Sequence, residues 1–202
     1  RDTYRNVLKE TALAYLQVLP SSQDLIGAEV ELVTLESRER LLQAALTDIT
    51  DAYDYVFIDC PPSLGFLTLN ALVAANSVLV PIQCEYYALE GVGNLLQTIR
   101  RVRSLFNPSL RIEGFLLTMF DPRNNLSHQV VQDVRQNLSS QVFGTVIPRN
   151  VKLSECPSFG KPVVLYDITS RGAVRYLDLS KEIMDAEANG NAQETYCSGT
   201  GA

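Results

Sequence analysis

The sequence predicts an α/β fold, a doubly wound and mostly parallel sheet with helices on both faces. Four short apolar runs have the composition of strands that are buried on both faces, as parallel strands are. Helical stripes of apolar residues alternate with these runs, which is the order of a doubly wound sheet. A chain of 202 residues with 46% hydrophobic and 20% charged residues is long enough for one domain with a sizeable core.

The predicted strands each stop at residues that cannot continue a ladder. Residues 53–59 (YDYVFID) indicate a buried strand that ends at Asp59, because Cys60, Pro61 and Pro62 follow it. A second strand is expected over 77–82 (SVLVPI), and the last two over 111–120 (RIEGFLLTMF) and 142–147 (VFGTVI), the latter stopped by Pro148. Before them, residues 14–19 are compatible with a further strand, and residues 37–49 with a helix.

Three amphipathic helices are expected after these strands. Apolar residues form one stripe over 89–106, step by four over 126–138, and form a looser stripe over 174–184. Periodicity is lost from Glu187, so we expect one α/β domain over 1–186 and a disordered tail over 187–202. In this architecture ligands bind at the carboxyl ends of the strands, which are the positions of Asp59, Asp121 and residues 148–150.

Composition excludes several classes of protein and site. The apolar runs are only a few residues long, far below the roughly 18 that a membrane helix needs. The four cysteines include no CxxC pair, which disfavours a zinc ribbon and a disulfide scaffold and favours a reducing compartment. His128 is the one histidine, so a mechanism with several imidazoles is excluded, and we expect this side chain on a helix surface without a functional role.

The net charge of −6 is unevenly distributed along the chain. Residues 100–181 carry twelve Lys and Arg against six Asp and Glu, whereas the remainder is strongly acidic. A basic segment of this kind fits a polyanion-binding surface, and it equally fits a solvated face of arginines. For Arg100, Arg101 and Arg103 the exposed face of a helix is the favoured interpretation.

Asp59 is the first candidate for chemistry. A carboxylate at the end of a hydrophobic strand suits a phosphate-transfer site, where it holds Mg²⁺ or a water bound to it beside a nucleotide. Pro61 and Pro62 would stiffen the loop that follows. The alternative is an aspartate that ends a strand and caps a turn.

The string YDYVFIDCPPSLGFLTLNAL (53–72) resembles the Walker B and switch II region of the ParA/Soj partition ATPases, of the deviant-Walker-A P-loop family. The resemblance covers most of residues 14–183 and implies a P-loop NTPase-like fold that binds ATP and Mg²⁺. The other segments that carry it are LQVLPSSQDLIGAEVEL, VLVPIQCEYYALEGVGNLL, GFLLTMFDPRNNLSHQVVQDVR and VIPRNVKLSECPSFGKPVVLYDITSRGAVRYLDLSKEI.

The sequence departs from that family in one respect. The KGGVGKT-type phosphate loop of the family is absent: Gly160-Lys161 is followed by Pro162, and Gly91-Val92-Gly93 lacks the lysine. We therefore expect an N-terminally truncated sheet without its first strand-loop-helix unit, and no ATP hydrolysis by this chain alone, because backbone N–H groups and a lysine of that loop hold the phosphates. Whether the protein is an enzyme stays open at this point.

The resemblance also implies roles for single residues. Asp59 supports catalysis and the Mg²⁺ site, through a water, and Cys60, Pro61 and Pro62 form the switch II loop. The nucleotide base is expected near the strand end, and the phosphates of nonspecific duplex DNA are expected at basic residues. The base-binding set is Pro148, Arg149, Asn150, Thr118 and Met119, and the DNA-binding set is Arg123, Lys152 and Arg171.

A ParA/Soj-like protein would form a homodimer on ATP binding and release DNA when a ParB-like centromere-binding partner stimulates hydrolysis. The resemblance implies a cytoplasmic, nucleoid-associated protein. One alternative is a membrane-associated relative similar to MinD, which needs a basic amphipathic C-terminal helix; residues 183–202 contain no Lys or Arg, which disfavours it. The other is a non-enzymatic remnant that retains a dimer or partner surface.

Overall fold

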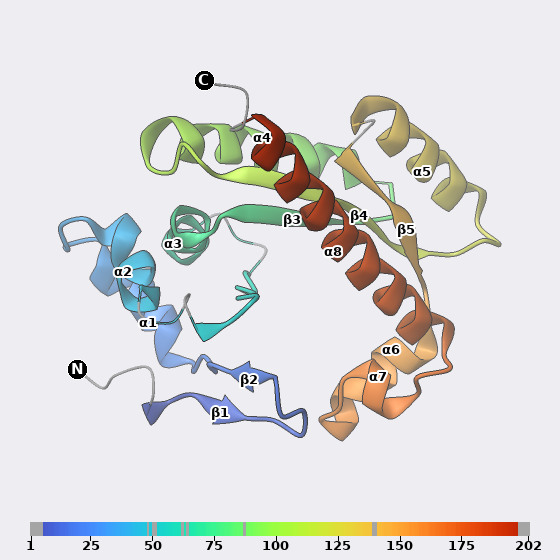
Figure 1. Cartoon of the computed structure of the whole chain (residues 1–202), viewed down its shortest axis with the longest axis horizontal. Helices are drawn as coiled ribbons and strands as arrows, with labels where there is room; N and C mark the ends of the chain where they lie inside the picture. Colours follow the sequence, from blue (N-terminus) through green and yellow to red (C-terminus); the bar gives the residue numbers. More distant parts are fainter. Residues whose placement is uncertain are drawn as a thin grey trace. The chain divides into compact units, whose positions relative to one another are not determined.

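Two compact units make up the chain, one formed by residues 1–77 and 97–111 and the other by residues 78–96 and 112–202. Figure 1 marks their helices and strands. The computed structural model describes residues 6–47, 49, 52–61, 63, 65–86, 88–138 and 141–197.

The second unit contains a three-stranded sheet in the order β3-β4-β5. The strands are β3 (Ser77–Gln83), β4 (Arg111–Phe120) and β5 (Val142–Pro148), and β4 and β5 run parallel. They confirm the predicted strands 77–82, 111–120 and 142–147. The helices that follow them are α4 (Ala88–Leu105), α5 (Asn125–Leu138), α6 (Val151–Glu155), η5 (Cys156–Phe159), α7 (Val163–Tyr166) and α8 (Arg171–Cys197).

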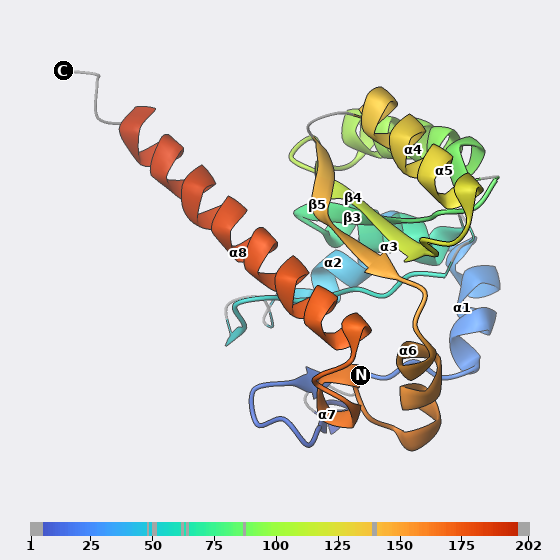
Figure 2. The same ribbon diagram turned by 90° about the vertical axis from the view of Figure 1, so that its right-hand side faces the viewer.

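Helices cover both faces of this sheet, as a doubly wound fold requires. The first half of α4 and α5 pack Val92, Val130 and Val134 against Phe115 and Leu117 on one face. The opposite face packs Leu116, Phe143 and Ile147 against Leu179 of α8. Figure 2 shows α8 along β5, on the side of the sheet away from α5. The apolar runs that predicted a parallel sheet therefore correspond to strands with both faces covered by helices.

The pairing of β4 with β5 is interrupted twice. Phe115 lies opposite Val142, and Leu117 opposite Val146, so β5 advances four residues while β4 advances two. Near the carboxyl end the next pair is Phe120 with Pro148, and Met119 before it has a left-handed φ of 54°. Such bulges bend strands and redirect side chains, and they are common beside functional sites.

One glycine of β4 allows a close approach. A Cβ on Gly114 would lie 2.6 Å from an atom of the Phe143 ring, which covers this position from β5. Any larger residue would collide with that buried ring. Gly114 therefore leaves room for the Phe143 ring on the face of the sheet that α8 covers.

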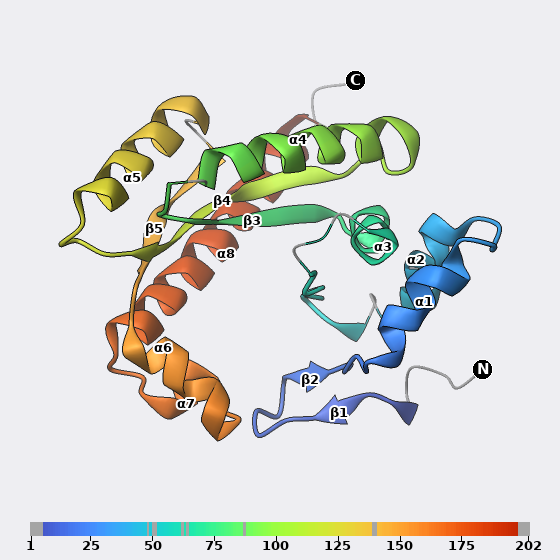
Figure 3. The ribbon, with the colours of Figure 1, turned by 180° about the vertical axis from the view of Figure 1, so that it is seen from behind.

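Two buried asparagines link separate segments of the first unit by hydrogen bonds to the backbone. It contains a short antiparallel pair, β1 (Lys9–Glu10) with β2 (Gln17–Val18), which Figure 3 shows from behind. Asn70 donates from Nδ2 to the carbonyls of Arg38 (2.8 Å) and Phe66 (3.0 Å) and accepts from the backbone N–H of Leu42 (3.1 Å). The helices of the unit are α1 (Asp24–Leu32), η2 (Arg38–Arg40), α2 (Leu41–Leu46) and α3 (Phe66–Ala74).

Asn107 closes the end of α3. Its Nδ2 group donates to the carbonyls of Leu72 (3.0 Å), Val73 (3.2 Å) and Ala75 (2.8 Å), and its side chain is buried. The last carbonyls of a helix have no partner inside the helix, so a buried helix end needs donors of this kind. Asn107 follows α4 in the sequence and thereby ties that segment to α3.

The prediction of a buried strand over residues 53–59 is wrong. Residues 55–60 form no regular element, and the Phe57 side chain is 82% exposed. The rings of Tyr55 and Phe57 stack with centroids 6.2 Å apart, as side chains two residues apart do on an extended backbone. A strand needs a neighbour to bond to, and within the described ranges no strand pairs with this segment.

Two further elements differ from the sequence-based expectation. The strand expected over 14–19 is reduced to the two residues of β2. Helix α8 continues to Cys197, into the tail expected over 187–202, and residues 198–202 of that tail lie outside the described residues. That segment has no apolar stripe, but its Ala, Glu and Gln residues have high intrinsic helix propensity, which favours continuation of the helix.

Candidate functional site

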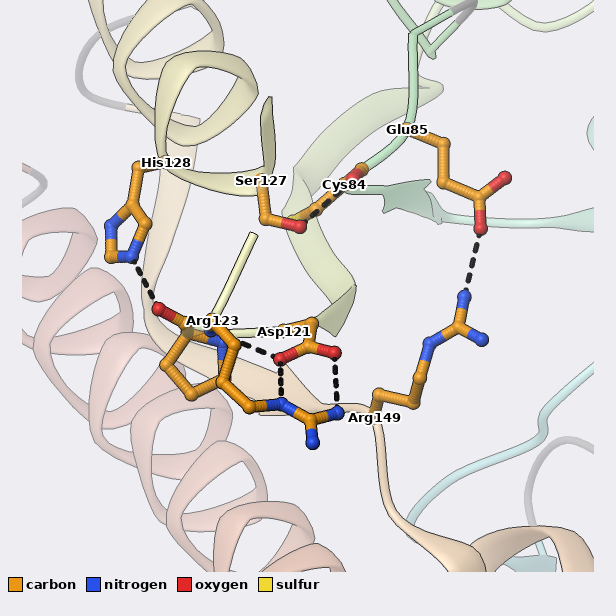
Figure 4. A network of polar contacts seen from close by, with 8 residues as sticks. Cys84, Glu85, Asp121, Arg123, Ser127, His128 and Arg149 are labelled. Carbon is orange, nitrogen blue, oxygen red and sulfur yellow. Dashed lines mark hydrogen bonds and ion pairs between the residues drawn. The ribbon is translucent and has the colours of Figure 1, made fainter. Parts of the chain in front are cut away.

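The carboxyl ends of β3, β4 and β5 lie together in the second unit. The backbone N–H of Cys84 donates to the carbonyl of Thr118 (2.9 Å), and the N–H of Arg149 donates to the carbonyl of Phe120 (2.9 Å). These bonds extend the sheet by one residue past β3 and β5. Figure 4 shows the polar side chains that follow the three strand ends. The strand ends at Asp121 and at residues 148–150 therefore lie together, whereas Asp59 belongs to the first unit.

Asp121 and Arg123 form the tightest charged pair at this edge. Arg123 Nε donates to Asp121 Oδ1 (3.0 Å) and Nη2 to Oδ2 (2.9 Å), a two-point contact, while the Arg123 backbone N–H also reaches Oδ1 (3.0 Å). The side-chain hydrogen bond from Arg123 lowers the pKa of Asp121 to about 2, so this carboxylate is charged at every physiological pH. The Arg123 side chain is 86% exposed and faces solvent.

The predicted base-binding residues occupy the ends of β4 and β5. Arg149 Nη2 lies 3.0 Å from Glu85 Oε1. Asn150 is the N-cap of α6, since its Oδ1 accepts from the backbone N–H of Lys152 (2.8 Å). Thr118 Oγ1 donates to the carbonyl of Ile82 (3.3 Å). With Pro148 and Met119 these residues lie near one another in the sheet. No pattern in the sequence indicated the partner Glu85.

Lys152 is also paired with a carboxylate. Its Nζ lies 3.0 Å from Glu155 Oε2 and 5.5 Å from the centroid of the Tyr166 ring. The Tyr166 hydroxyl donates to the same Glu155 oxygen (3.0 Å). The hydrogen bond from Lys152, and to a smaller extent that from Tyr166, lowers the pKa of Glu155. Arg171, the third predicted DNA contact, is exposed at the start of α8 and has no ion pair with any described residue.

His128 and Ser127 hold the start of α5 to this edge. Ser127 Oγ donates to the carbonyl of Cys84 (3.3 Å), and His128 Nε2 lies 3.1 Å from the carbonyl oxygen of Pro122. The His128 ring also meets the ring of Phe120 edge-on at 5.0 Å. The histidine is exposed, as expected, and it contacts the loop that carries Arg123.

Asp59, Cys60 and Pro61 belong to the first unit, where all three are exposed. Pro62 lies outside the described residues. The pKa of the Cys60 thiol is raised by desolvation and then by the charge on Asp59, so the thiol is protonated at neutral pH and poorly suited to act as a nucleophile.

Asp59 has the donor type that a Mg²⁺ ion accepts. Asp59 offers carboxylate oxygens, which Mg²⁺ prefers, and Mg²⁺ keeps several waters when few protein ligands are present. The described residues contain no group of three His, Cys, Asp or Glu arranged for a metal. None of the described helices is long and apolar enough to cross a membrane.

Comparison with known proteins gives consistent matches. A family model described as an AAA domain matches residues 1–112. The chain is 58% identical over 180 residues to the chromosome partitioning protein ParA of Myxococcus xanthus, covering 89% of this chain and 64% of that protein. It is 54% identical over 178 residues to the sporulation initiation inhibitor protein Soj of Bacillus subtilis, covering 88% of this chain and 70% of that protein. The chain thus spans about two thirds of the length of these relatives.

A solved structure supports the fold. Cobyrinic acid a,c-diamide synthase from Mycobacterium smegmatis, with a bound ATP analog and magnesium, superposes with a TM-score of 0.68 at 37% identity, covering 79% of this chain and 70% of that one. The α/β fold with a parallel sheet is therefore confirmed.

Proposed function

Because the chain belongs to the ParA/Soj family of chromosome partitioning ATPases, we propose that the full-length protein carrying it is an ATP-dependent DNA partition protein. It binds ATP with Mg²⁺, forms a homodimer, binds duplex DNA without sequence preference, and hydrolyses ATP when a ParB-like partner stimulates it. The observation that carries this proposal is identity of 54–58% with partition proteins over 88–89% of the chain. Its place in the cell is the nucleoid in the cytoplasm.

The residues proposed for the nucleotide take separate parts. Asp59 would hold the Mg²⁺ ion through a water, and Cys60, Pro61 and Pro62 would form the switch II loop behind it. Mg²⁺, when bound, neutralises charge on the phosphates. Pro148 and Arg149, beside the bulge at Met119, present the ring and the side chain against which a base packs. These 202 residues contain no KGGVGKT-type loop, so we propose that they do not hydrolyse ATP by themselves.

Arg123, Lys152 and Arg171 serve the DNA phosphates. All three follow strands or begin helices of the second unit, and their exposed or half-exposed side chains reach outward. Contacts from arginine and lysine to phosphate carry no sequence information and lose strength as salt is added. We therefore expect DNA binding through these three residues to be independent of sequence and to weaken as salt is added.

The test is DNA binding by the full-length protein with ATP and Mg²⁺. Arg123→Ala combined with Lys152→Ala should weaken binding to a random-sequence duplex and flatten the plot of log K against log salt, by at most about 0.9 per cation lost. ATP binding should be unchanged. Arg175→Ala is the matched control, because Arg175 is an exposed, ion-paired cation of α8 outside the proposed set. Unchanged affinity and slope in the double variant would place the DNA surface elsewhere.

A further inference from the structure

We propose that two carboxylates, Asp121 and Glu155, set the strength and the salt dependence of DNA binding. Each is ion-paired with a cation of the proposed DNA-binding set, Arg123 or Lys152, and a DNA phosphate must displace the carboxylate before it can bind that cation. The inference rests on the proposed DNA binding and concerns the same surface. It gives a role to two acidic residues of the basic segment 100–181, whose Lys and Arg residues fit a polyanion-binding surface.

In the first pair, the guanidinium is accessible but occupied. Two donors of Arg123 meet the two oxygens of Asp121 at 3.0 and 2.9 Å, which is the two-point geometry that arginine also uses on a phosphate. The Arg123 side chain is 86% exposed, whereas that of Asp121 is 21% exposed. A phosphate can therefore approach the cation from solvent, and it competes with Asp121 for the same donors.

The second pair repeats this arrangement on α6. Lys152 Nζ and the Tyr166 hydroxyl both contact Oε2 of Glu155 at 3.0 Å. The Lys152 side chain is 44% exposed, so its ammonium group is accessible as well. Two of the three cations in the proposed DNA set are thus already neutralised by a carboxylate of the same unit.

Each carboxylate keeps a donor after its cation leaves. Asp121 retains the backbone N–H of Arg123 at 3.0 Å, and Glu155 retains the Tyr166 hydroxyl. Neither carboxylate is deeply buried, so neither becomes an unpaired buried charge. Breaking an exposed ion pair of this kind costs about two- to fivefold in an equilibrium constant. The exchange of a carboxylate for a phosphate is therefore feasible and has a measurable cost.

The same pairs reduce the response to salt. A free cation that binds DNA releases about 0.9 of a condensed counterion, which gives the slope of log K against log salt. A cation beside a carboxylate presents a local charge close to zero and displaces fewer counterions. Removing the carboxylate charge should therefore steepen the slope, by at most about 0.9 for each cation set free.

The experiment uses Asp121→Asn and Glu155→Gln, which conserve shape and remove one negative charge each. Binding of the full-length protein, with ATP and Mg²⁺, to a fluorescent random-sequence duplex is followed by anisotropy over a series of salt concentrations. Each variant should bind about two- to fivefold more tightly at low salt and show a steeper slope. Asp178→Asn is the control, because it removes the same charge from an exposed pair with Arg175 on α8.

A double-mutant cycle separates pairing from general repulsion. Asp121→Asn should have little effect in an Arg123→Ala background, and Glu155→Gln little effect in a Lys152→Ala background. The proposal is overturned if the single variants bind like the wild type, or if Asp178→Asn and the alanine backgrounds show the same gain. A wild-type protein that binds no DNA refutes the proposed function together with this inference. Normal wild-type binding with unaltered carboxylate variants refutes this inference alone.

Discussion

Replacing Glu182 by glutamine should destabilise the second unit by about 2 kcal/mol at neutral pH. Glu182 lies on α8, and its two oxygens accept from the backbone N–H groups of Gly144 (2.6 Å) and Thr145 (3.0 Å). Both donors lie in the stretch of β5 where the register with β4 shifts. Hydrogen bonds to a charged group contribute about 1.5–3 kcal/mol each, and partial exposure of Glu182 favours the lower end of that range. A glutamine would keep one acceptor and point an NH₂ group at the other donor.

The effect should depend on pH in one direction. Desolvation acts to raise the pKa of Glu182, but hydrogen bonds from Gly144 and Thr145 outweigh it, and the pKa lies below the ordinary value of 4.5. A carboxylate whose pKa is lowered by folding contributes stability above its unfolded pKa and loses it as the pH falls through its folded pKa. The difference between wild type and Glu182→Gln should therefore be complete at pH 7 and shrink below 4.5.

Two measurements test this reasoning. Urea unfolding at neutral and at acidic pH gives the difference in free energy of unfolding, and hydrogen exchange reports the amides of Gly144 and Thr145 directly. Asp185→Asn is the control, since Asp185 is an exposed carboxylate one turn further along α8. The reasoning is refuted if the variant unfolds like the wild type, if its two amides keep their protection, or if the difference persists undiminished at acidic pH.

Two other substitutions have clear expected outcomes. Asn107→Ala should lower the free energy of unfolding by about 2–3 kcal/mol in urea titrations, because three carbonyls at the end of α3 lose their donor; a loss under 0.5 kcal/mol would show that water replaces it. Asp59→Asn should abolish most Mg²⁺-dependent ATP turnover by the full-length protein, with Asp54→Asn as the control in the same segment. Wild-type turnover in Asp59→Asn would remove this carboxylate from the mechanism.

The sequence predicts the strands that pair with a neighbour, and it fails at a segment for which the described residues offer no pairing strand. Residues 111–120 were predicted with the bounds of β4, and β3 and β5 extend one residue past the prediction. Residues 53–59 have the same apolar and β-branched composition but form no ladder. Composition shows that a segment suits a sheet, whereas pairing depends on contacts far away in the sequence.

The candidate site shows the same limit. The sequence indicated that Asp121, Arg149 and Asn150 follow strand ends, and the structure brings those ends together. It did not reveal which carboxylate holds which cation, because Glu85 and Arg149 are far apart along the chain. Glu182 was also missed, since a glutamate in an amphipathic helix has the appearance of a solvated residue. The sequence did contain one hint of this contact. Gly144 lies inside β5, and a glycine within a strand often marks a bulge, where a backbone N–H is left free to bind a side chain such as Glu182.

The left-handed backbone of Met119 leaves no simple route to a more stable strand end. A residue with a side chain is destabilised by about 1–2 kcal/mol in this conformation, and glycine by far less. Glycine would nevertheless give up the half-buried Met119 side chain and gain freedom in the unfolded chain, so the relief of strain is offset. The surrounding packing therefore holds the strained residue in place, and this strand end is expected to resist laboratory selection for thermostability.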